Sequence, residues 1–186
     1  MIASGQASAE LVRSVKVEAM TTTGPAFCAL GPLRFICDEM LRGVGGWLRV
    51  AGYDTLLPAQ GEADATLLAR ARQEDRWLVT RDRKLMEHAG ATAYVVLLES
   101  DTLQGNLLEL TLRMDIDWLS RAFSRCKRCN NVLLESAEPS PRHGVPPDII
   151  KQRISLLFCP ACDQFFWHGS HAERMQRRLA ELNRKR

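Results

Sequence analysis

Four of the six cysteines in this 186-residue chain form two Cys-x-x-Cys pairs separated by 29 residues: Cys126, Cys129, Cys159 and Cys162. Four thiolates satisfy a tetrahedral Zn²⁺ ion and leave no open position, so the predicted site is structural rather than catalytic. A module of roughly fifty residues needs such a metal to fold. The spacing therefore predicts a C-terminal zinc ribbon with an irregular hairpin between its two pairs.

Acidic residues follow several short apolar segments further toward the N-terminus. Asp38 follows residues 33–37, Asp82 follows residues 77–80, and Asp64 opens a helical segment after residues 53–57. The carboxyl ends of parallel strands meet at one edge of a sheet, where ligands bind. Clustered carboxylates repel one another unless a cation neutralises them, and oxygen ligands select Mg²⁺ or Mn²⁺. Such a site can activate water against a phosphodiester.

Each acid also has an ordinary structural interpretation. Asp64 is well placed to be a helix N-cap, and Asp38 and Asp82 can be plain strand-end acids. Glu99 and Asp101 follow a fourth apolar segment and are candidates for an additional acid or for solvated loop residues. The chain has neither a Gly-rich phosphate loop nor a Gly-x-Ser-x-Gly elbow, so the acids offer the best available chemistry.

The elements that must position these acids alternate along the chain. Strands are predicted at 33–37, 53–57, 77–80 and 94–98, and helices at 40–51, from 64, at 84–88, from 103 capped by Thr102, and from about 171 to 186. Such alternation implies an α/β fold with a parallel sheet flanked by helices. Three glycines interrupt the first helix, and each lowers its stability by about 1 kcal/mol relative to alanine. Packing against the rest of the domain must therefore stabilise this helix.

Charge divides the chain unevenly. Residues 33–120 carry a net charge of −4, and residues 121–186 carry +7. We expect a poorly ordered extension at 1–32, a nuclease domain at 33–120, and the ribbon with a basic C-terminal helix at 121–186. No apolar run is as long as the roughly 20 residues of a membrane helix, and the first residues lack the pattern of a signal peptide. We therefore expect a cytoplasmic protein.

Three stretches carry a resemblance to a known family: Phe35–Leu41, Trp47–Thr55 and Leu78–Arg83. Together with Cys126-x-x-Cys129-Asn130 and Cys159-x-x-Cys162 followed by Phe166–His171, they resemble the mutator-seven C-terminal RNase domain family, a PIN-like group. The resemblance covers roughly 33–175. It implies a PIN-like fold, metal-dependent cleavage of RNA, and Asp38, Asp64 and Asp82 as the acids. The chain departs from the family in its first helix, at Leu41–Gly46, and no fourth acid carries over.

The basic end of the chain is the expected RNA-binding part. Ser170 is predicted to cap the final helix, with Met175 and Leu179 facing the ribbon. Aromatic residues near Trp167 can stack on bases or pack against the nuclease domain. The candidate RNA-binding residues are Arg81, Arg83, Trp167, His168, His171, Arg174, Arg177 and Arg178.

Two functions follow from these observations. The first is a metal-dependent endoribonuclease that hydrolyses single-stranded RNA at the aspartate cluster with Mg²⁺ or Mn²⁺ and keeps a structural Zn²⁺. The alternative is a non-catalytic RNA- or protein-binding module with the same fold and ribbon. Metal-dependent turnover discriminates between them.

Overall fold

A computed structural model describes residues 33–136, 139–140, 143–152 and 154–186. The extension expected at residues 1–32 lies outside these residues. Within the described chain, no helix combines the length and apolar character needed to cross a bilayer.

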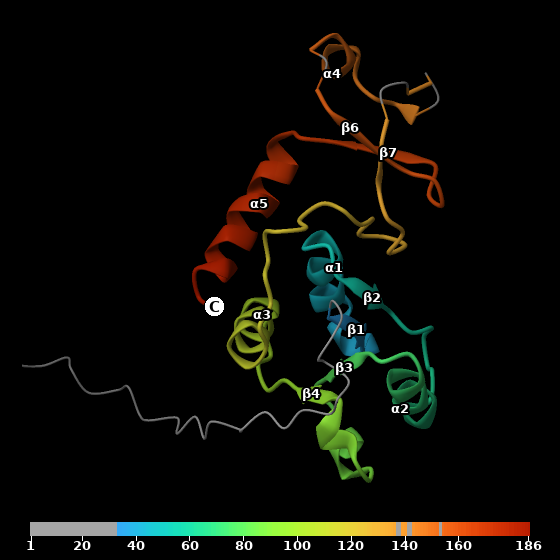
Figure 1. Ribbon diagram of the computed structural model, residues 1–186, viewed down its shortest axis with the longest axis vertical. Helices are drawn as coiled ribbons and strands as arrows, with labels where there is room; N and C mark the ends of the chain where they lie inside the picture. Colours follow the sequence, from blue (N-terminus) through green and yellow to red (C-terminus); the bar gives the residue numbers. More distant parts are fainter. Residues whose placement is uncertain (1–32, 137–138, 141–142, 153) are drawn as a thin grey trace, which may run out of the picture.

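A four-stranded parallel sheet forms the centre of the N-terminal part (Figure 1). Its strands lie in the order β2-β1-β3-β4, which places the predicted acid-bearing strands β1 and β3 next to each other. The prediction of an α/β fold with a parallel sheet is therefore confirmed. The strands are β1 (Arg34–Cys37), β2 (Asp54–Leu56), β3 (Trp77–Thr80) and β4 (Val95–Leu97).

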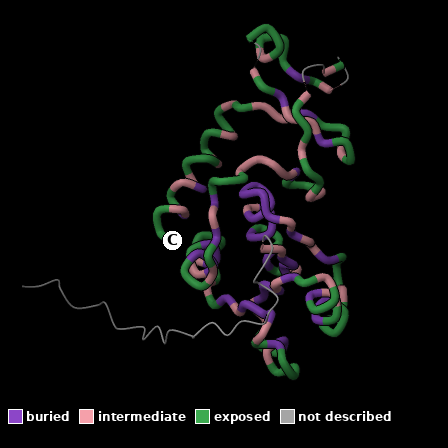
Figure 2. Tube along the Cα trace, viewed as in Figure 1, coloured by how far each residue is buried: buried purple, intermediate pink, exposed green. Residues whose placement is uncertain are grey.

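Helices cover both faces of this sheet. They are α1 (Arg42–Val50), α2 (Asp64–Gln73) and α3 (Leu103–Arg113), and three 3-10 segments accompany them: η2 (Glu39–Leu41), η3 (Arg83–Glu87) and η4 (Ala91–Ala93). Strand residues alternate between the faces. Phe35 therefore packs with α1 and α3, whereas its neighbour Ile36 packs with α2. Both faces of the sheet are buried (Figure 2).

Tertiary packing explains the central glycine of α1, Gly45. A Cβ added at Gly45 would lie 2.5 Å from Leu57 Cδ2 and 3.3 Å from the sulfur of Cys37. The helix approaches the sheet too closely for a side chain at this position. The propensity cost of the glycine is offset because α1 buries Val44 and Leu48 in the core.

The C-terminal part contains a second, smaller sheet. Strands β5 (Leu134–Glu135), β6 (Leu156–Cys159) and β7 (Gln164–Trp167) pair antiparallel, and α4 (Pro147–Lys151) lies beside them. Its core is small, with Val145, Leu156 and Phe165 buried. Such a core is too small to hold a module together without another source of stability.

The final helix α5 (Ser170–Asn183) corrects two expectations. Its N-cap is Gly169, which makes no side-chain cap, and Ser170 is the first helical residue. Leu179 is fully buried in the core that holds β1 and α3, and Met175 packs against the same core. The prediction that these two residues face the ribbon is wrong, because α5 packs against α3 and directs them into the larger of the two cores.

Candidate functional site

The four predicted zinc ligands converge on one point. Their sulfur atoms all lie within 4.8 Å of one another, with Cys126 Sγ 3.8 Å from Cys162 Sγ and Cys129 Sγ 3.3 Å from Cys159 Sγ. Tetrahedral Zn²⁺ with Zn–S bonds of about 2.3 Å separates its sulfurs by about 3.8 Å. The cluster therefore has the donor set and spacing that fit one zinc ion.

Close packing of these thiols shifts their pKa values in opposite directions. A hydrogen bond with Cys129, together with burial, raises the pKa of Cys162 to about 12. Burial raises the pKa of Cys129, but hydrogen bonds from Asn131 and Cys162 outweigh it and bring the value to about 6. Four thiolates cannot share this space without a compensating positive charge.

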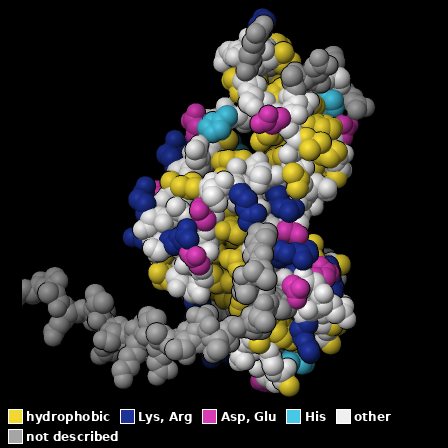
Figure 3. Space-filling view, in the orientation of Figure 1, with side chains coloured by type: hydrophobic (Ala, Val, Ile, Leu, Met, Phe, Trp, Pro, Cys, Tyr) yellow, Lys and Arg dark blue, Asp and Glu magenta, His cyan; other side chains and the backbone are white. Residues whose placement is uncertain are grey.

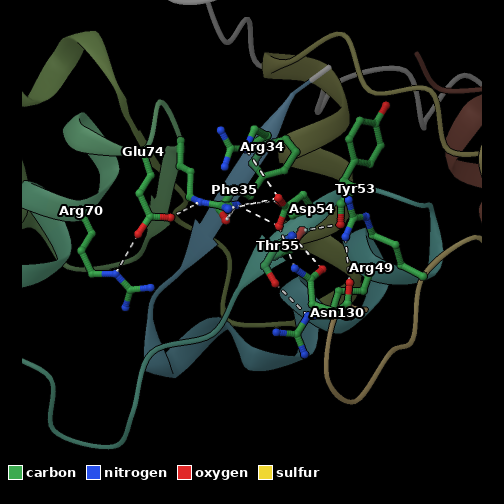
Figure 4. A network of polar contacts seen from close by, with 11 residues as sticks. Arg34, Phe35, Arg49, Tyr53, Asp54, Thr55, Arg70, Glu74 and Asn130 are labelled. Atoms are coloured by element: carbon green, nitrogen blue, oxygen red, sulfur yellow. Dashed lines mark hydrogen bonds and ion pairs between the residues drawn. The ribbon is translucent and has the colours of Figure 1, made fainter. Parts of the chain in front are cut away.

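Arg49 and Asn130 attach the first cysteine pair to the parallel sheet (Figure 4). The Arg49 side chain is buried and donates to the carbonyl oxygens of Arg128 at 2.7 Å and Thr55 at 2.8 Å. Asn130 Oδ1 accepts the N–H of Thr55 at 3.0 Å. Strand β2 is the edge of the sheet, so these side chains occupy the position where another strand would pair.

Asp54 belongs to the same polar network. Arg76 donates to both of its carboxylate oxygens, at 3.0 and 3.1 Å, and Asn130 Nδ2 donates at 2.7 Å. Arg34 forms a further ion pair at 3.5 Å. Burial raises the pKa of Asp54, but the hydrogen bonds from Arg76 and Asn130 dominate and lower it to about 2. This acid joins the ribbon to the sheet.

Asp38 and Asp82 lie on either side of Thr80, at the carboxyl ends of β1 and β3. The Thr80 hydroxyl donates to Asp38 Oδ2 at 2.8 Å and accepts the backbone N–H of Asp82 at 2.9 Å. Asp82 Oδ1 accepts the N–H of Lys84, while Oδ2 makes no hydrogen bond within the described chain. Both carboxylates are partly exposed, so oxygen atoms at this edge are available to a cation.

The other candidate acids, Asp64, Glu99 and Asp101, make no hydrogen bond or ion pair with Asp38, Thr80 or Asp82 within the described chain. Asp64 is exposed at the first position of α2, where Ala63 and not Asp64 is the N-cap. Asp101 forms an ion pair with Arg81, and Glu99 lies 3.4 Å from Arg83. Among the described residues, the acids form no group of three whose ligand atoms all lie within 4.8 Å.

The candidate RNA-binding residues of α5 are mostly exposed, and Lys and Arg side chains appear along this flank of the molecule (Figure 3). Arg178 pairs with Glu181 at 3.3 Å, whereas Arg177 is exposed. His168 Nε2 lies 3.0 Å from Gln176 Oε1, and Arg174 Nη2 lies 3.4 Å from His171 Nδ1. Trp167 packs against the ribbon core and not against the nuclease domain.

Sequence reasoning missed Arg49, Arg76 and Asn130. Arg49 could have been found from its position among the apolar residues of α1, because a buried guanidinium needs hydrogen-bond acceptors. It also missed Asn106 on α3, which is 4% exposed and whose Oδ1 has no hydrogen-bond partner within the described chain. A buried amide oxygen of this kind is expected to bind water or an ion.

A comparison with known protein families matches residues 33–179 to the Mut7-C RNAse domain. Neither a curated protein nor a solved structure matches the chain. The family match spans well over half of the 186 residues, and the chain therefore belongs to the Mut7-C RNAse domain family.

Proposed function

We propose that the chain is a divalent-metal-dependent endoribonuclease whose acids are Asp38, Asp64 and Asp82. The observation that carries the proposal is the placement of Asp38 and Asp82 beside Thr80 on adjacent strands, in a chain of an RNase family. Asp64 is the first residue of α2, the helix that follows β2, so Asp64 comes after the carboxyl end of a strand, as Asp38 and Asp82 do. Glu99 and Asp101 remain candidates for an additional acid.

These residues have the oxygen donors that Mg²⁺ or Mn²⁺ requires. When bound, such an ion activates water and stabilises the charge that develops on a phosphodiester. The Thr80 hydroxyl orients Asp38 by donating to Oδ2, and Lys84 holds Asp82 through Oδ1. The ion pairs of Arg81 and Arg83 with Asp101 and Glu99 are exposed and weak, so both arginines can turn to RNA phosphates.

We further propose that residues 33–120 form the nuclease unit and residues 121–186 a zinc-bound, basic, RNA-binding unit of a cytoplasmic protein. Arg174, Arg177 and Arg178 lie within about one turn of α5 and can contact phosphates, and His168 and His171 are exposed beside them. The preferred substrate is single-stranded RNA, whose unpaired bases aromatic side chains can reach.

Cleavage of unstructured RNA by the zinc-loaded chain, with and without Mn²⁺ or Mg²⁺, tests the proposal. Wild type should cut only with the added ion, and Asp38→Asn and Asp82→Asn should lose at least a hundredfold in rate. The matched control is Asp75→Asn, since Asp75 is an exposed acid at the opposite end of β3 with a φ of 51° that asparagine tolerates. If wild type cuts no RNA while binding it, the chain is the non-catalytic RNA-binding module instead.

A further inference from the structure

The zinc ribbon and the proposed acids lie at opposite ends of the nuclease sheet. Asp38 and Asp82 follow the last residues of β1 and β3. The first cysteine pair contacts the beginning of β2 through Thr55 and the last turn of α1 through Arg49. Thr55 pairs with Phe35, which lies three residues before Asp38, so the two regions are about 10 Å apart along the strand direction.

One aromatic residue of the ribbon faces away from the ribbon core. In the β6–β7 pairing, Phe165 and Trp167 lie on the face that packs against Val145, whereas Phe166 pairs with Leu157 on the other face. Phe166 and Leu157 are half-buried, and neither is packed against a core cluster of the described chain. Phe166 therefore keeps part of its surface exposed, whereas Phe165 is buried.

Arg128 reaches the same face of the ribbon through a hydrogen bond to Gln164. Gln164 lies two residues before Phe166, on the same face of β7, and accepts a hydrogen bond from Arg128 Nη1 at 3.3 Å. Arg128 and its neighbour Lys127 are exposed, while Glu135, opposite Leu157, contributes one acid. We call Leu157, Gln164, Phe166 and Arg128 the open ribbon face. A partly exposed aromatic ring, on the same face as a glutamine that binds an arginine, offers a stacking surface for an unpaired base and a cation for its phosphate.

We propose that the open ribbon face stacks on a base of the same RNA strand whose phosphodiester reaches the acids at the other end of the sheet. The substrate is then a single strand of several nucleotides, long enough to pass from one end of the domain to the other, and a shorter oligonucleotide engages only one end. This inference rests on the proposed function for the acid end. It assigns the base contact to Phe166 and not to Trp167.

Fluorescence anisotropy of an oligouridine length series tests the inference, using zinc-loaded full-length chain with Asp82→Asn to prevent cleavage. The Kd should fall steeply at the length that reaches both ends. Phe166→Ala should bind the long strand about tenfold more weakly, and Phe166→Tyr should restore binding. Arg128→Gln gives a second variant should Phe166→Ala fold poorly, and it should also weaken binding. Ile150→Ala, an exposed apolar residue of α4, should bind as wild type.

A second measurement locates the stacked base. The cleavage-competent chain is given a set of long RNA strands that share one known cut site. Each strand carries a single abasic nucleotide at a different position. The rate should fall at one fixed distance from the cut, and this dependence should disappear in Phe166→Ala. If no RNA is cleaved, the proposed function is wrong, but the anisotropy series still tests the inference about binding. A Kd independent of length, or Phe166→Ala binding as tightly as wild type, overturns the inference.

Discussion

The two groups of metal-competent residues differ in how completely the protein alone assembles them. The four cysteines already lie within 4.8 Å of one another, and neighbouring side chains hold the first pair against the sheet. The acids stand at the ends of separate strands and helices, and only Asp38 and Asp82 are linked, through Thr80. Two of the four cysteines are buried, whereas Asp38, Asp64 and Asp82 are all partly or fully exposed.

This difference matches the roles proposed for the two groups. A structural ion needs all of its positions filled by protein, and its binding energy becomes folding energy. A catalytic ion needs open positions for water and substrate, so its ligands stay exposed and mutually repelling until it binds. Stability should therefore depend strongly on the cysteines and their contacts with the sheet, and weakly on the acids.

Removing zinc should have the largest effect. The ribbon core is small, and loss of the metal should unfold the ribbon and withdraw Asn130 from the edge of the sheet. The amide of Thr55 donates to Asn130 Oδ1, so chelation should increase its hydrogen exchange by orders of magnitude. The amide of Leu78, which donates to Tyr94 within the nuclease domain, should stay protected. Unchanged protection at Thr55 would show that the ribbon does not support the sheet.

Replacing Arg76 should have the next largest effect. Arg76 is 4% exposed and donates to both oxygens of Asp54, so Arg76→Met leaves a carboxylate without its main partner. We expect a loss of about 3 kcal/mol in the free energy of unfolding. Urea titration measures it, with Arg72→Met as an exposed control on α2. A loss no larger than that of the control would contradict the role given to Asp54.

Acid should weaken the same network. Because the pKa of Asp54 is lowered from 3.8 to about 2 in the folded chain, its contribution is complete above pH 4 and is lost as the pH falls toward 2. The contribution is at most about 2 kcal/mol. Unfolding titrations across this range should show a steeper pH dependence in wild type than in Asp54→Asn. Parallel curves for the two proteins would argue against a strongly acidic Asp54.

Asp82→Asn should have the smallest effect on stability. Asparagine retains the oxygen that accepts the N–H of Lys84, so without divalent cations the free energy of unfolding should change by less than about 0.5 kcal/mol. Added Mn²⁺ should raise the Tm of zinc-loaded wild type and leave that of the variant nearly unchanged, because only wild type keeps the full set of acids. Equal shifts in both proteins would place the manganese site elsewhere.

The sequence by itself determined the order of the main elements and the four-cysteine cluster. Alternating apolar segments predicted the four parallel strands, and the predicted segment at 77–80 coincides with β3. The Cys-x-x-Cys pairs predicted the cluster because two ligands in each pair are close in sequence, so local geometry brings them together. The sequence also predicted that Asp38 and Asp82 lie at one edge of the sheet, because the ends of parallel strands share an edge, and both contact Thr80 there.

Only the tertiary structure decided how the parts meet. The sequence assigned Leu179 to the ribbon, whereas packing buries it with the nuclease sheet, because helical periodicity identifies an apolar face but not its partner. It proposed no structural role for Arg49, Asp54 or Asn130, yet these residues join the ribbon to the edge strand. Asn130 and Thr55 are 75 residues apart. Contacts over such separations depend on the folded arrangement of both modules, which no local pattern contains.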